Sequence, residues 1–359
     1  MAPIWNRNPP KATHAETTPS VRIDGYLAGR IRADGPGLAL AVVRDGAVVH
    51  AAGYGLADRR GDPITPDVMF HLASCGKQFT GLGIAMLAEQ GKLDLDDPVA
   101  RHLPLLAGFG PQVTIRRLLH HTSGIRDLYG EIEQALARGE RATNAGMMRI
   151  YVDLGCPLAD DASRPGDTFC YSNSGYDLLG AVIERVSGQS YHDFFQQRVF
   201  DPVGMTDTFS VPDRRAGGPR CATGYIRDAQ GACVEHGGTG IDEIVGSGSF
   251  YATVSDLCRY DRALAGNRLL SEVGMRQIFT SGGTSDGSSA AYGFGWFLGT
   301  EQGERFAEHA GRWIGFTSYI RRFLDRPFSI FLLSNHPGLD LFEIAREATA
   351  AFDESRFVA

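Results

Sequence analysis

The stretch MFHLASCGKQFTGLGIAMLAEQ, residues 69–90, changes from an extended pattern to a helical one at Ser74. Beyond that serine, apolar side chains recur at helical spacing and predict a helix with one buried face through about Gln90: Phe79, Leu82, Met86 and Leu87. Ser74 and Lys77 form an S-x-x-K at the start of this helix. A spacing of three places both side chains on one face, about 5 to 6 Å apart at Cβ, so the amine can reach the hydroxyl.

Lysine is rare in this chain. Of 35 lysines and arginines, the lysines are Lys11, Lys77 and Lys92. A serine needs an adjacent base to act as a nucleophile at neutral pH, and a desolvated lysine can release its proton whereas arginine cannot. An ordinary alternative has Ser74 as an N-cap and Lys77 as a solvated first-turn residue. The apolar helix that follows favours a buried Lys77, which we predict to be the base.

Two further segments carry polar groups suited to acyl chemistry. Y-S-N at residues 171–173 precedes a helical pattern, and its phenol could shuttle protons if nearby cations lower the phenol pKa. H-A-G at residues 309–311 ends a predicted strand, RFAEHAG. Its glycine would let a ligand backbone approach, and its histidine could donate a hydrogen bond to an acyl oxygen or a substrate carboxylate. Either segment alone is also consistent with a structural role.

The remaining pattern predicts an α/β (α+β) fold. Two β-branched runs around Asp45-Gly46, in residues 37–53, indicate a hairpin. Helices are predicted near 115–121, 144–152, 174–187, 254–265 and 339–352, and strands near 291–299, 316–323 and 327–335. We therefore expect an antiparallel sheet built from both chain ends and flanked by helices, with an inserted, mostly helical region.

The same pattern suggests a division of the chain into three parts. Residues 1–20 are polar and proline-rich and are expected to be disordered, with folding beginning near Val21. Residues 21–72 plus 285–359 would form the sheet region. Residues 73–284 would form the mostly helical region that carries the S-x-x-K helix and the Y-x-N loop.

In order and spacing, the three segments resemble the S-x-x-K, Y-x-N and K-T-G/H-x-G motifs of the class C β-lactamase and penicillin-binding-protein superfamily. Flanking stretches are similar to that superfamily as well: YGLAD, FHLAS, GKLDLDDPV, TIRRLLHHTSGI, YSNSGYDLLG and YGFGW. The resemblance covers about residues 35–335 and implies a β-lactamase/transpeptidase-like fold. His309 stands where true β-lactamases have lysine, which puts efficient β-lactam hydrolysis in doubt.

The resemblance implies a role for each matching residue. Ser74 would form the acyl-enzyme, and Lys77 and Tyr171 would share the general acid/base work. Asn173 would orient Lys77 and the substrate. The oxyanion hole would consist of the backbone N–H groups of Ser74 and of Arg312, the residue that follows Gly311.

These roles predict a serine hydrolase that cleaves an ester or amide without a cofactor. Its expected partner is a small-molecule ester, amide or short peptide. A carboxylesterase or a D-amino-acid peptidase or amidase is the first interpretation. The alternatives are a β-lactamase or DD-carboxypeptidase, an acyltransferase or thioesterase-cyclase, and a non-catalytic acyl or peptide sensor on the same fold.

Composition argues against other classes. The net charge of −7 and the absence of a long basic run argue against nucleic acid as a partner, and no run approaches the roughly 20 apolar residues of a membrane span. The first 20 residues lack the apolar core of a secretory signal, and six scattered cysteines suit a reducing compartment, so a cytoplasmic protein is expected.

Two motif-like features are expected to be inert. Adjacent His120 and His121 point apart on a helix and no H-E-x-x-H is present, so no metal site is predicted. Residues 283–287 match G-x-S-x-G around Ser285, but that motif requires a preceding strand and a following helix. Here the neighbouring sequence is typical of a loop.

Overall fold

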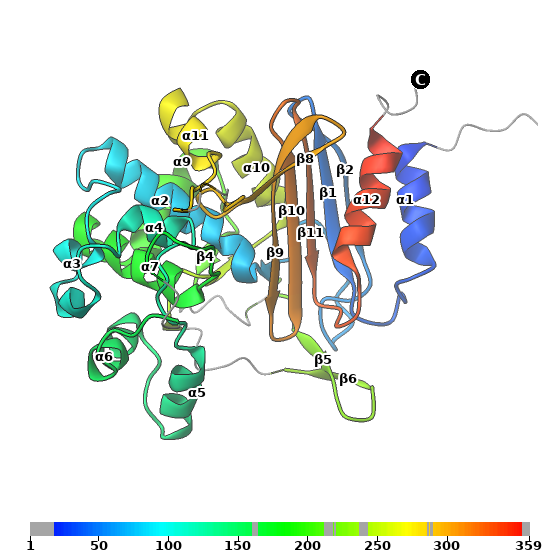
Figure 1. The fold of residues 1–359 in the computed structure, drawn as a ribbon. Helices are drawn as coiled ribbons and strands as arrows, with labels where there is room; N and C mark the ends of the chain where they lie inside the picture. The colour runs from blue at the N-terminus through cyan, green and yellow to red at the C-terminus, as the bar shows by residue number, and fades with distance from the viewer. Residues whose placement is uncertain are drawn as a thin grey trace, which may run out of the picture.

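The computed structural model describes residues 18–159, 164–211, 218, 220–236, 243–285, 287 and 290–353. Its centre is a six-stranded antiparallel sheet in the order β2-β1-β11-β10-β9-β8 (Figure 1). The strands are β1 (Leu38–Arg44), β2 (Ala47–Tyr54), β8 (Phe297–Glu301), β9 (Glu304–Trp313), β10 (Phe316–Phe323) and β11 (Phe328–Ser334). The prediction of an antiparallel sheet built from both chain ends is therefore confirmed.

The β1–β2 hairpin turns at the predicted dipeptide. Asp45 and Gly46 both have positive φ, +52° and +74°, which is the geometry of the two-residue turn that suits the twist of paired strands. Arg44 and Ala47 pair directly across this turn. The turn residues thus fix the register of the first two strands.

Both faces of the sheet are apolar. On β1, Leu38, Leu40 and Val42 pack in one cluster with α1 (Pro19–Ala28) and α12 (Leu341–Phe352), and the alternate residues Ala39 and Ala41 pack in a second, larger cluster. Alternate residues of a strand point to opposite faces of the sheet, and here the residues on both faces are apolar because both faces are buried. Figure 1 shows α1 and α12 on one face and the inserted helical region on the other.

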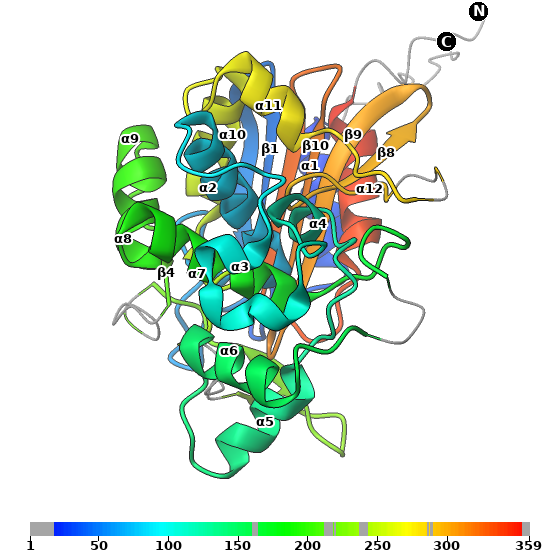
Figure 2. The ribbon, with the colours of Figure 1, turned by 60° about the vertical axis from the view of Figure 1, so that its left-hand side comes forward.

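The inserted region is mostly helical (Figure 2). Its longer helices are α2 (Lys77–Glu89), α5 (Tyr129–Ala137), α6 (Asn144–Asp153), α7 (Asn173–Ser187), α10 (Val254–Ala265) and α11 (Glu272–Ile278). Its shorter ones are η1 (Ala73–Gly76), α3 (Val99–His102), η2 (Pro104–Phe109), α4 (Ile115–Leu119), α8 (Tyr191–Phe195), the π-turn η3 (Gln196–Phe200) and α9 (Asp201–Val203). α2 packs against α7, so the two predicted motif helices are neighbours.

Two small sheets were not predicted. One has the order β3-β7-β4, from β3 (Phe70–His71), β7 (Phe250–Ala252) and β4 (Phe209–Ser210), and the other pairs β5 (Tyr225–Arg227) with β6 (Cys233–Glu235). Strands of two or three residues are too short to show the alternation on which a sequence-based prediction depends. β3 nevertheless matters, because it leads directly into the Ser74 turn.

The N-terminal boundary differs from the expected one. Residues 1–17 lie outside the described residues, but 18–20 already belong to an ordered helix start, where the Thr18 hydroxyl accepts from Val21 N and Pro19 is the first helical residue. The division into a 21–72 plus 285–359 region and a 73–284 region stays a prediction.

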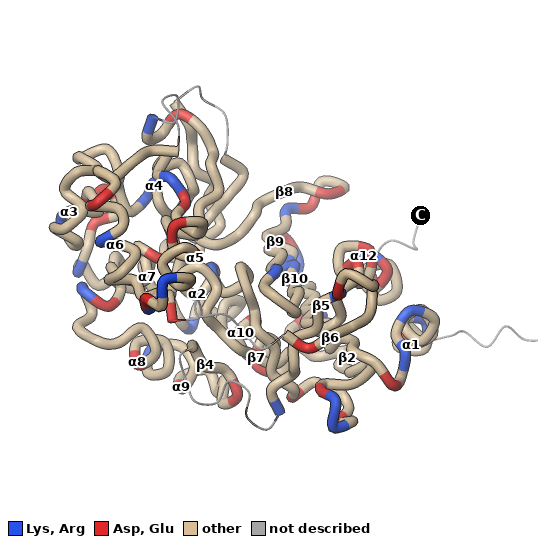
Figure 3. The backbone as a smooth tube through the Cα atoms, turned by 90° about the horizontal axis from the view of Figure 1, so that it is seen from below, with Lys and Arg blue, Asp and Glu red and all other residues tan. Residues whose placement is uncertain are grey.

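Neither the distribution of charged residues nor the hydrophobicity of the helices marks out a special region of the molecule among the described residues. Acidic and basic positions are interspersed along the chain in the view of Figure 3. Among the described residues, no helix is both long enough and apolar enough to cross a membrane.

Candidate active site

Ser74 lies in η1, a short 3₁₀ helix that follows β3 and runs directly into α2, so the predicted helical segment does open at this serine, with a first turn that is 3₁₀ rather than α. The preceding residue, Ala73, has φ +47°, a left-handed conformation that is strained for an alanine. Two side chains hold the turn: Ala73 N donates to His71 Nδ1 at 3.0 Å, and Ser318 Oγ donates to Leu72 O at 2.6 Å. The Ser74 backbone is therefore fixed before any substrate arrives.

Two glycines flank this turn at close range. A Cβ at Gly311 of β9 would lie 2.4 Å from Leu72 O and 2.3 Å from Ser318 Oγ, and one at Gly248 would lie 2.7 Å from Ala73 O. From the sequence, Gly311 was expected to allow the approach of a ligand backbone. The structure shows a different reason for the glycine, since β9 packs directly against the protein's own Ser74 turn.

Lys77 is completely buried at the start of α2. Its Nζ donates to Ser74 Oγ at 3.1 Å, to Asn173 Oδ1 at 2.7 Å and to Ser247 O at 2.7 Å. Burial lowers the pKa of this amine, while the carboxylates of Asp177 and Asp127 act in the opposite direction. The solvated first-turn interpretation of Lys77 is therefore excluded, and the amine lies within reach of the hydroxyl.

Tyr171 closes the group around Ser74. The Lys77 Nζ lies 4.9 Å from the centre of its ring. Burial raises the pKa of the phenol above its usual value, and a hydrogen bond with the Ser74 side chain opposes that rise only in part. This corrects the expectation that nearby cations lower the pKa. The phenol is neutral at physiological pH, so it can donate a proton or a hydrogen bond rather than act as a standing phenolate.

Asn173 reaches Lys77 from the first residue of α7. Ser172 is the N-cap, whose hydroxyl accepts from Gly175 N, and the Asp127 carboxylate accepts from the backbone N–H of Asn173 at 2.7 Å. Negative charge at a helix N-terminus is favourable. These caps fix the position of the Asn173 amide, whose oxygen is one of the three hydrogen-bond acceptors of the Lys77 amine.

His309 lies on β9 with both ring nitrogens engaged inside the protein. Nδ1 is 2.7 Å from Ala310 O and must donate to it, so Nε2, 3.0 Å from Tyr292 OH, accepts. Burial lowers the pKa of His309 to about 3. From the sequence, this ring was expected to donate a hydrogen bond to an acyl oxygen or a substrate carboxylate. In this arrangement it has neither a free N–H nor a positive charge for that role.

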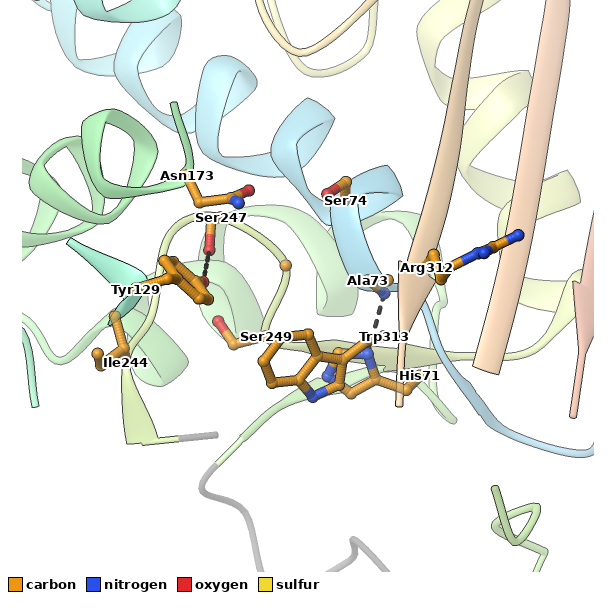
Figure 4. A pocket seen from close by; sticks show the side chains of 11 residues that line it. His71, Ala73, Ser74, Tyr129, Asn173, Ile244, Ser247, Ser249, Arg312 and Trp313 are labelled. Atoms are coloured by element: carbon orange, nitrogen blue, oxygen red, sulfur yellow. Dashed lines mark hydrogen bonds between the residues drawn. The ribbon is translucent and has the colours of Figure 1, made fainter. Parts of the chain in front are cut away.

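A pocket of about 150 Å³ opens beside Ser74 (Figure 4). The lining combines apolar side chains with polar ones: Tyr129, Ile244 and Trp313, and His71, Asn173, Ser247 and Ser249. Arg312 also lines it, and in Figure 4 its guanidinium points away from Ser74. The backbone N–H groups of Ser74 and Arg312 thus belong to residues of one pocket, and their oxyanion role stays a prediction.

Several residues of this site were not predicted. The Ser247 carbonyl accepts from Lys77, and the Ser247 hydroxyl lies 3.0 Å from Tyr129 OH. Ser247 sits in a Gly-Ser-Gly-Ser run that has no helical or strand signal. Asp177 carried a usable signal, because it lies one turn beyond Asn173 on the predicted helix and so on the same face.

Ser285 and His120 have ordinary structural environments, whereas the His121 ring centre lies 4.3 Å from that of Tyr171 and its Nε2 is buried without a hydrogen-bond partner among the described residues. Ser285 Oγ donates to Asp167 Oδ1 at 2.6 Å, in a turn that follows α11 and precedes β8, and the described residues around it form neither the strand nor the helix of a nucleophile elbow. His120 Nδ1 lies 2.7 Å from Tyr292 O, and His121 Nδ1 accepts from Ser172 N. Among the described residues, no cluster of three potential metal ligands occurs.

Comparison with known proteins identifies the family. The family model described as Beta-lactamase matches residues 23–353, most of the chain, and the chain therefore belongs to this family of serine hydrolases. Penicillin-binding protein 4* of Bacillus subtilis is 35% identical over 301 residues, which are 80% of this chain and 64% of that protein. The putative penicillin-binding protein PbpX of Bacillus subtilis is 28% identical over 72% of this chain and 61% of its own length. The chain thus spans less than two thirds of these curated relatives.

Solved structures agree on the fold. The octameric penicillin-binding protein homologue from Pyrococcus abyssi superposes with a TM-score of 0.77 at 29% identity, covering 88% of this chain and 72% of that one. The D-amino acid amidase from Ochrobactrum anthropi SV3, complexed with L-phenylalanine amide, gives a TM-score of 0.76 at 23% identity, covering 94% and 98%. At that identity the second likeness supports the fold alone.

Proposed function

We propose that this protein hydrolyses a neutral ester or amide through a covalent acyl-enzyme on Ser74. The observation that carries the proposal is the 3.1 Å contact between Lys77 Nζ and Ser74 Oγ, made by an amine that is completely buried. Burial favours the uncharged amine, which is the form that can accept a proton. No cofactor is required for this chemistry.

The reaction would proceed in two halves. Lys77 takes the Ser74 proton as Oγ bonds to the carbonyl carbon, and the N–H groups of Ser74 and Arg312 would receive the charge on the carbonyl oxygen. The tetrahedral centre then expels the alcohol or amine, which takes its proton from the Tyr171 phenol, and Lys77 restores that proton to Tyr171. In the second half water takes the place of the leaving group: it gives its proton to Lys77 as its oxygen bonds to the acyl carbon, and Lys77 returns that proton to Ser74 Oγ as the acid leaves.

The neutral substrate class follows from the charges at the site. A substrate carboxylate would require a cation, but the His309 ring is neutral and the Arg312 guanidinium points away from Ser74 (Figure 4). The pocket volume is close to the roughly 150 Å³ that accommodates a benzene ring. We therefore favour an ester or amide that has no carboxylate and carries one ring-sized apolar group beside Tyr129 and Trp313.

A labelling experiment tests the reaction and a substrate panel tests the class. A fluorophosphonate probe, followed by mass spectrometry, should modify Ser74 in the wild type and leave Ser74→Ala unmodified. Turnover should then be compared for p-nitrophenyl butyrate, D- and L-phenylalanine amide, a β-lactam and a D-alanyl-D-alanine peptide. Absence of labelling would favour a non-catalytic sensor. Preference for the anionic β-lactam or peptide would contradict the neutral class.

A further inference from the structure

Asp177 is a buried carboxyl that the proposed chemistry does not use. It lies on α7 one turn beyond Asn173, and Asp177 has no exposed surface. Its Oδ1 accepts a hydrogen bond from the backbone N–H of Ser247 at 2.9 Å. Its Oδ2 is buried and has no hydrogen-bond partner among the described residues. A buried, half-satisfied carboxyl is costly to maintain, so its position calls for an explanation.

The hydrogen bonds around Ser247 connect this carboxyl to the base. Ser247 N donates to Asp177, and Ser247 O accepts from Lys77 at 2.7 Å, so one peptide segment bridges the two. The same segment is held one residue earlier, where Thr80 Oγ1 donates to Gly246 O at 2.5 Å. A Cβ on Gly246 would lie 2.7 Å from the Asp177 Cα, so the segment lies directly against α7.

Charge points to the same connection. The titratable groups that face Lys77 are Asp127, Asp177, Cys75, Tyr171, Tyr176, His121 and His309. Burial raises the pKa of the Cys75 thiol to about 12, raises those of both phenols and lowers those of both histidines, so these five are uncharged near neutrality. The two carboxyls remain, and burial raises the pKa of Asp177, while the hydrogen bond from Ser247 and the positive charge of Lys77 oppose that rise and favour the charged form of the carboxyl. Asp127 is already engaged at the N-terminus of α7.

We infer that Asp177 is a positioning residue for Lys77, holding the Ser247 carbonyl against the amine and supplying the buried negative charge that favours its protonated form. The inference rests on the proposed function, in which Lys77 must be uncharged to accept the Ser74 proton. Asp177 thereby sets the lower pH limit of activity without touching the substrate.

The charge part is tested with Asp177→Asn, whose carbonyl oxygen can still accept from Ser247 N. Without the opposing charge the Lys77 amine should lose its proton at lower pH, so the acid limb of kcat/KM for a neutral ester should move down by about one pH unit. Asp177→Ala should show the same movement and, because the Ser247 anchor is lost, a lower kcat as well. Asp256→Asn, a buried carboxyl on α10, should leave the limb in place.

The rarity of lysine allows a direct measurement. Protein labelled with ¹³C at lysine Cε contains three such carbons, from Lys11, Lys77 and Lys92, and Lys11→Arg and Lys92→Arg identify the third signal. In Asp177→Asn the Lys77 signal should titrate at lower pH while the other two do not move. An unmoved Lys77 signal in folded Asp177→Asn overturns the inference. The NMR titration needs no turnover, so it tests the role of Asp177 even if the proposed function is wrong. Failure of the proposed function would be seen separately, as turnover that persists in Ser74→Ala.

Discussion

At the scale of single residues, the site depends on an amine that has been removed from water. Lys77 makes three hydrogen bonds, but all three acceptors are uncharged oxygens of Ser74, Asn173 and Ser247. When the amine is uncharged it keeps two N–H donors, for Asn173 and Ser247, and its lone pair accepts from the Ser74 hydroxyl, so no direct ion pair holds a third proton on Nζ. The amine can therefore be uncharged near neutral pH, which an exposed lysine cannot.

This arrangement leads to a prediction for the base. Lys77→Gln keeps an amide donor toward Asn173 or Ser247 but has no lone pair able to accept a proton. Ester turnover should fall about 100-fold or more, the usual scale for loss of a general base. Steady-state kinetics measures this, with the circular dichroism spectrum as the control for folding. Activity near that of the wild type would show that Lys77 provides hydrogen bonds and not proton transfer.

The choice of nucleophile gives a second prediction. Ser74→Ala should abolish turnover of p-nitrophenyl acetate, because the hydroxyl beside Lys77 is lost. Ser285→Ala should leave the rate nearly unchanged, since that hydroxyl donates to Asp167 in a turn outside the Ser74 pocket. If Ser285→Ala is the inactive variant, the site has been placed in the wrong part of the molecule.

The third residue-scale prediction concerns His309. Its pKa of about 3 means that the ring is uncharged from pH 5.5 to 8.5, and both nitrogens bond within the protein. His309→Ala should therefore lower kcat/KM for a neutral ester and for a D-peptide with a free carboxylate by the same factor throughout that range. A defect confined to the anionic peptide at low pH would instead indicate an imidazolium that binds carboxylate.

The sequence could predict only part of this site. Ser74 and Lys77 are three residues apart, so their proximity follows from local geometry alone. Ser247 lies 170 residues from Lys77 in a stretch without periodicity, and no pattern could bring it to the amine. His309 was predicted as a site residue, but its bonding was not: Ala310 O belongs to the next residue on β9, whereas Tyr292 lies 17 residues away and reaches the ring only through tertiary packing.

At the scale of elements, the site exists where three short pieces of backbone meet. The Ser74 turn lies between β9, which approaches through Gly311, and the Gly246–Ser249 segment, which approaches through Gly248. The long, periodic elements β10, β11 and α7 were predicted to within two residues, since their periodicity is strong. For β3 and η1 the sequence predicted the extended and helical character of residues 69–73 and of the segment from Ser74, but not the element bounds or the 3₁₀ form of η1, because two-residue and four-residue elements carry little periodicity.

Gly311→Ala tests the meeting of β9 and the Ser74 turn. The new methyl group would lie 2.4 Å from Leu72 O, so the strand must move, and such overpacking costs about 1 to 3 kcal/mol of unfolding free energy. Activity should fall more steeply than stability, because β9 carries the expected oxyanion N–H of Arg312 and packs against the turn that carries the N–H of Ser74. Gly25→Ala on α1 is the matched control: nothing lies within 4 Å of its Cβ, and it should be neutral or slightly stabilising.

Urea unfolding and ester kinetics on the two glycine variants give the comparison. The interpretation fails if Gly311→Ala retains both the stability and the rate of the wild type, since β9 would then not be held against the turn. Equal losses in Gly25→Ala would show that the effect is not specific to the site.

At the scale of the whole molecule, the fold buries ionisable rings in an apolar interior without giving them charged partners. His71 and His309 each have a pKa lowered to about 3 by burial. Both lie beside the Ser74 turn, where the sheet meets the inserted region. The packing that keeps the site rigid thus makes the fold sensitive to acid.

The sign of this effect follows from proton linkage. In the unfolded chain a histidine binds a proton below about pH 6.5, whereas the folded state excludes the proton down to about pH 3. Between those values the unfolded state binds more protons, so stability is full above pH 6.5 and falls as the pH falls. Each such ring contributes up to about 1.4 kcal/mol per pH unit.

His71→Asn should reduce this acid sensitivity. The asparagine carbonyl can still accept from Ala73 N, as His71 Nδ1 does, but it does not titrate. At pH 7.5 the variant should be less stable than the wild type, because it fills less of the interior. Between pH 6 and pH 5 the wild type should lose about 1 kcal/mol more than the variant, so the difference between them should narrow. Urea unfolding of both proteins at pH 7.5, 6 and 5 measures this. Parallel losses would mean that His71 takes up its proton as readily in the folded protein as in the unfolded chain.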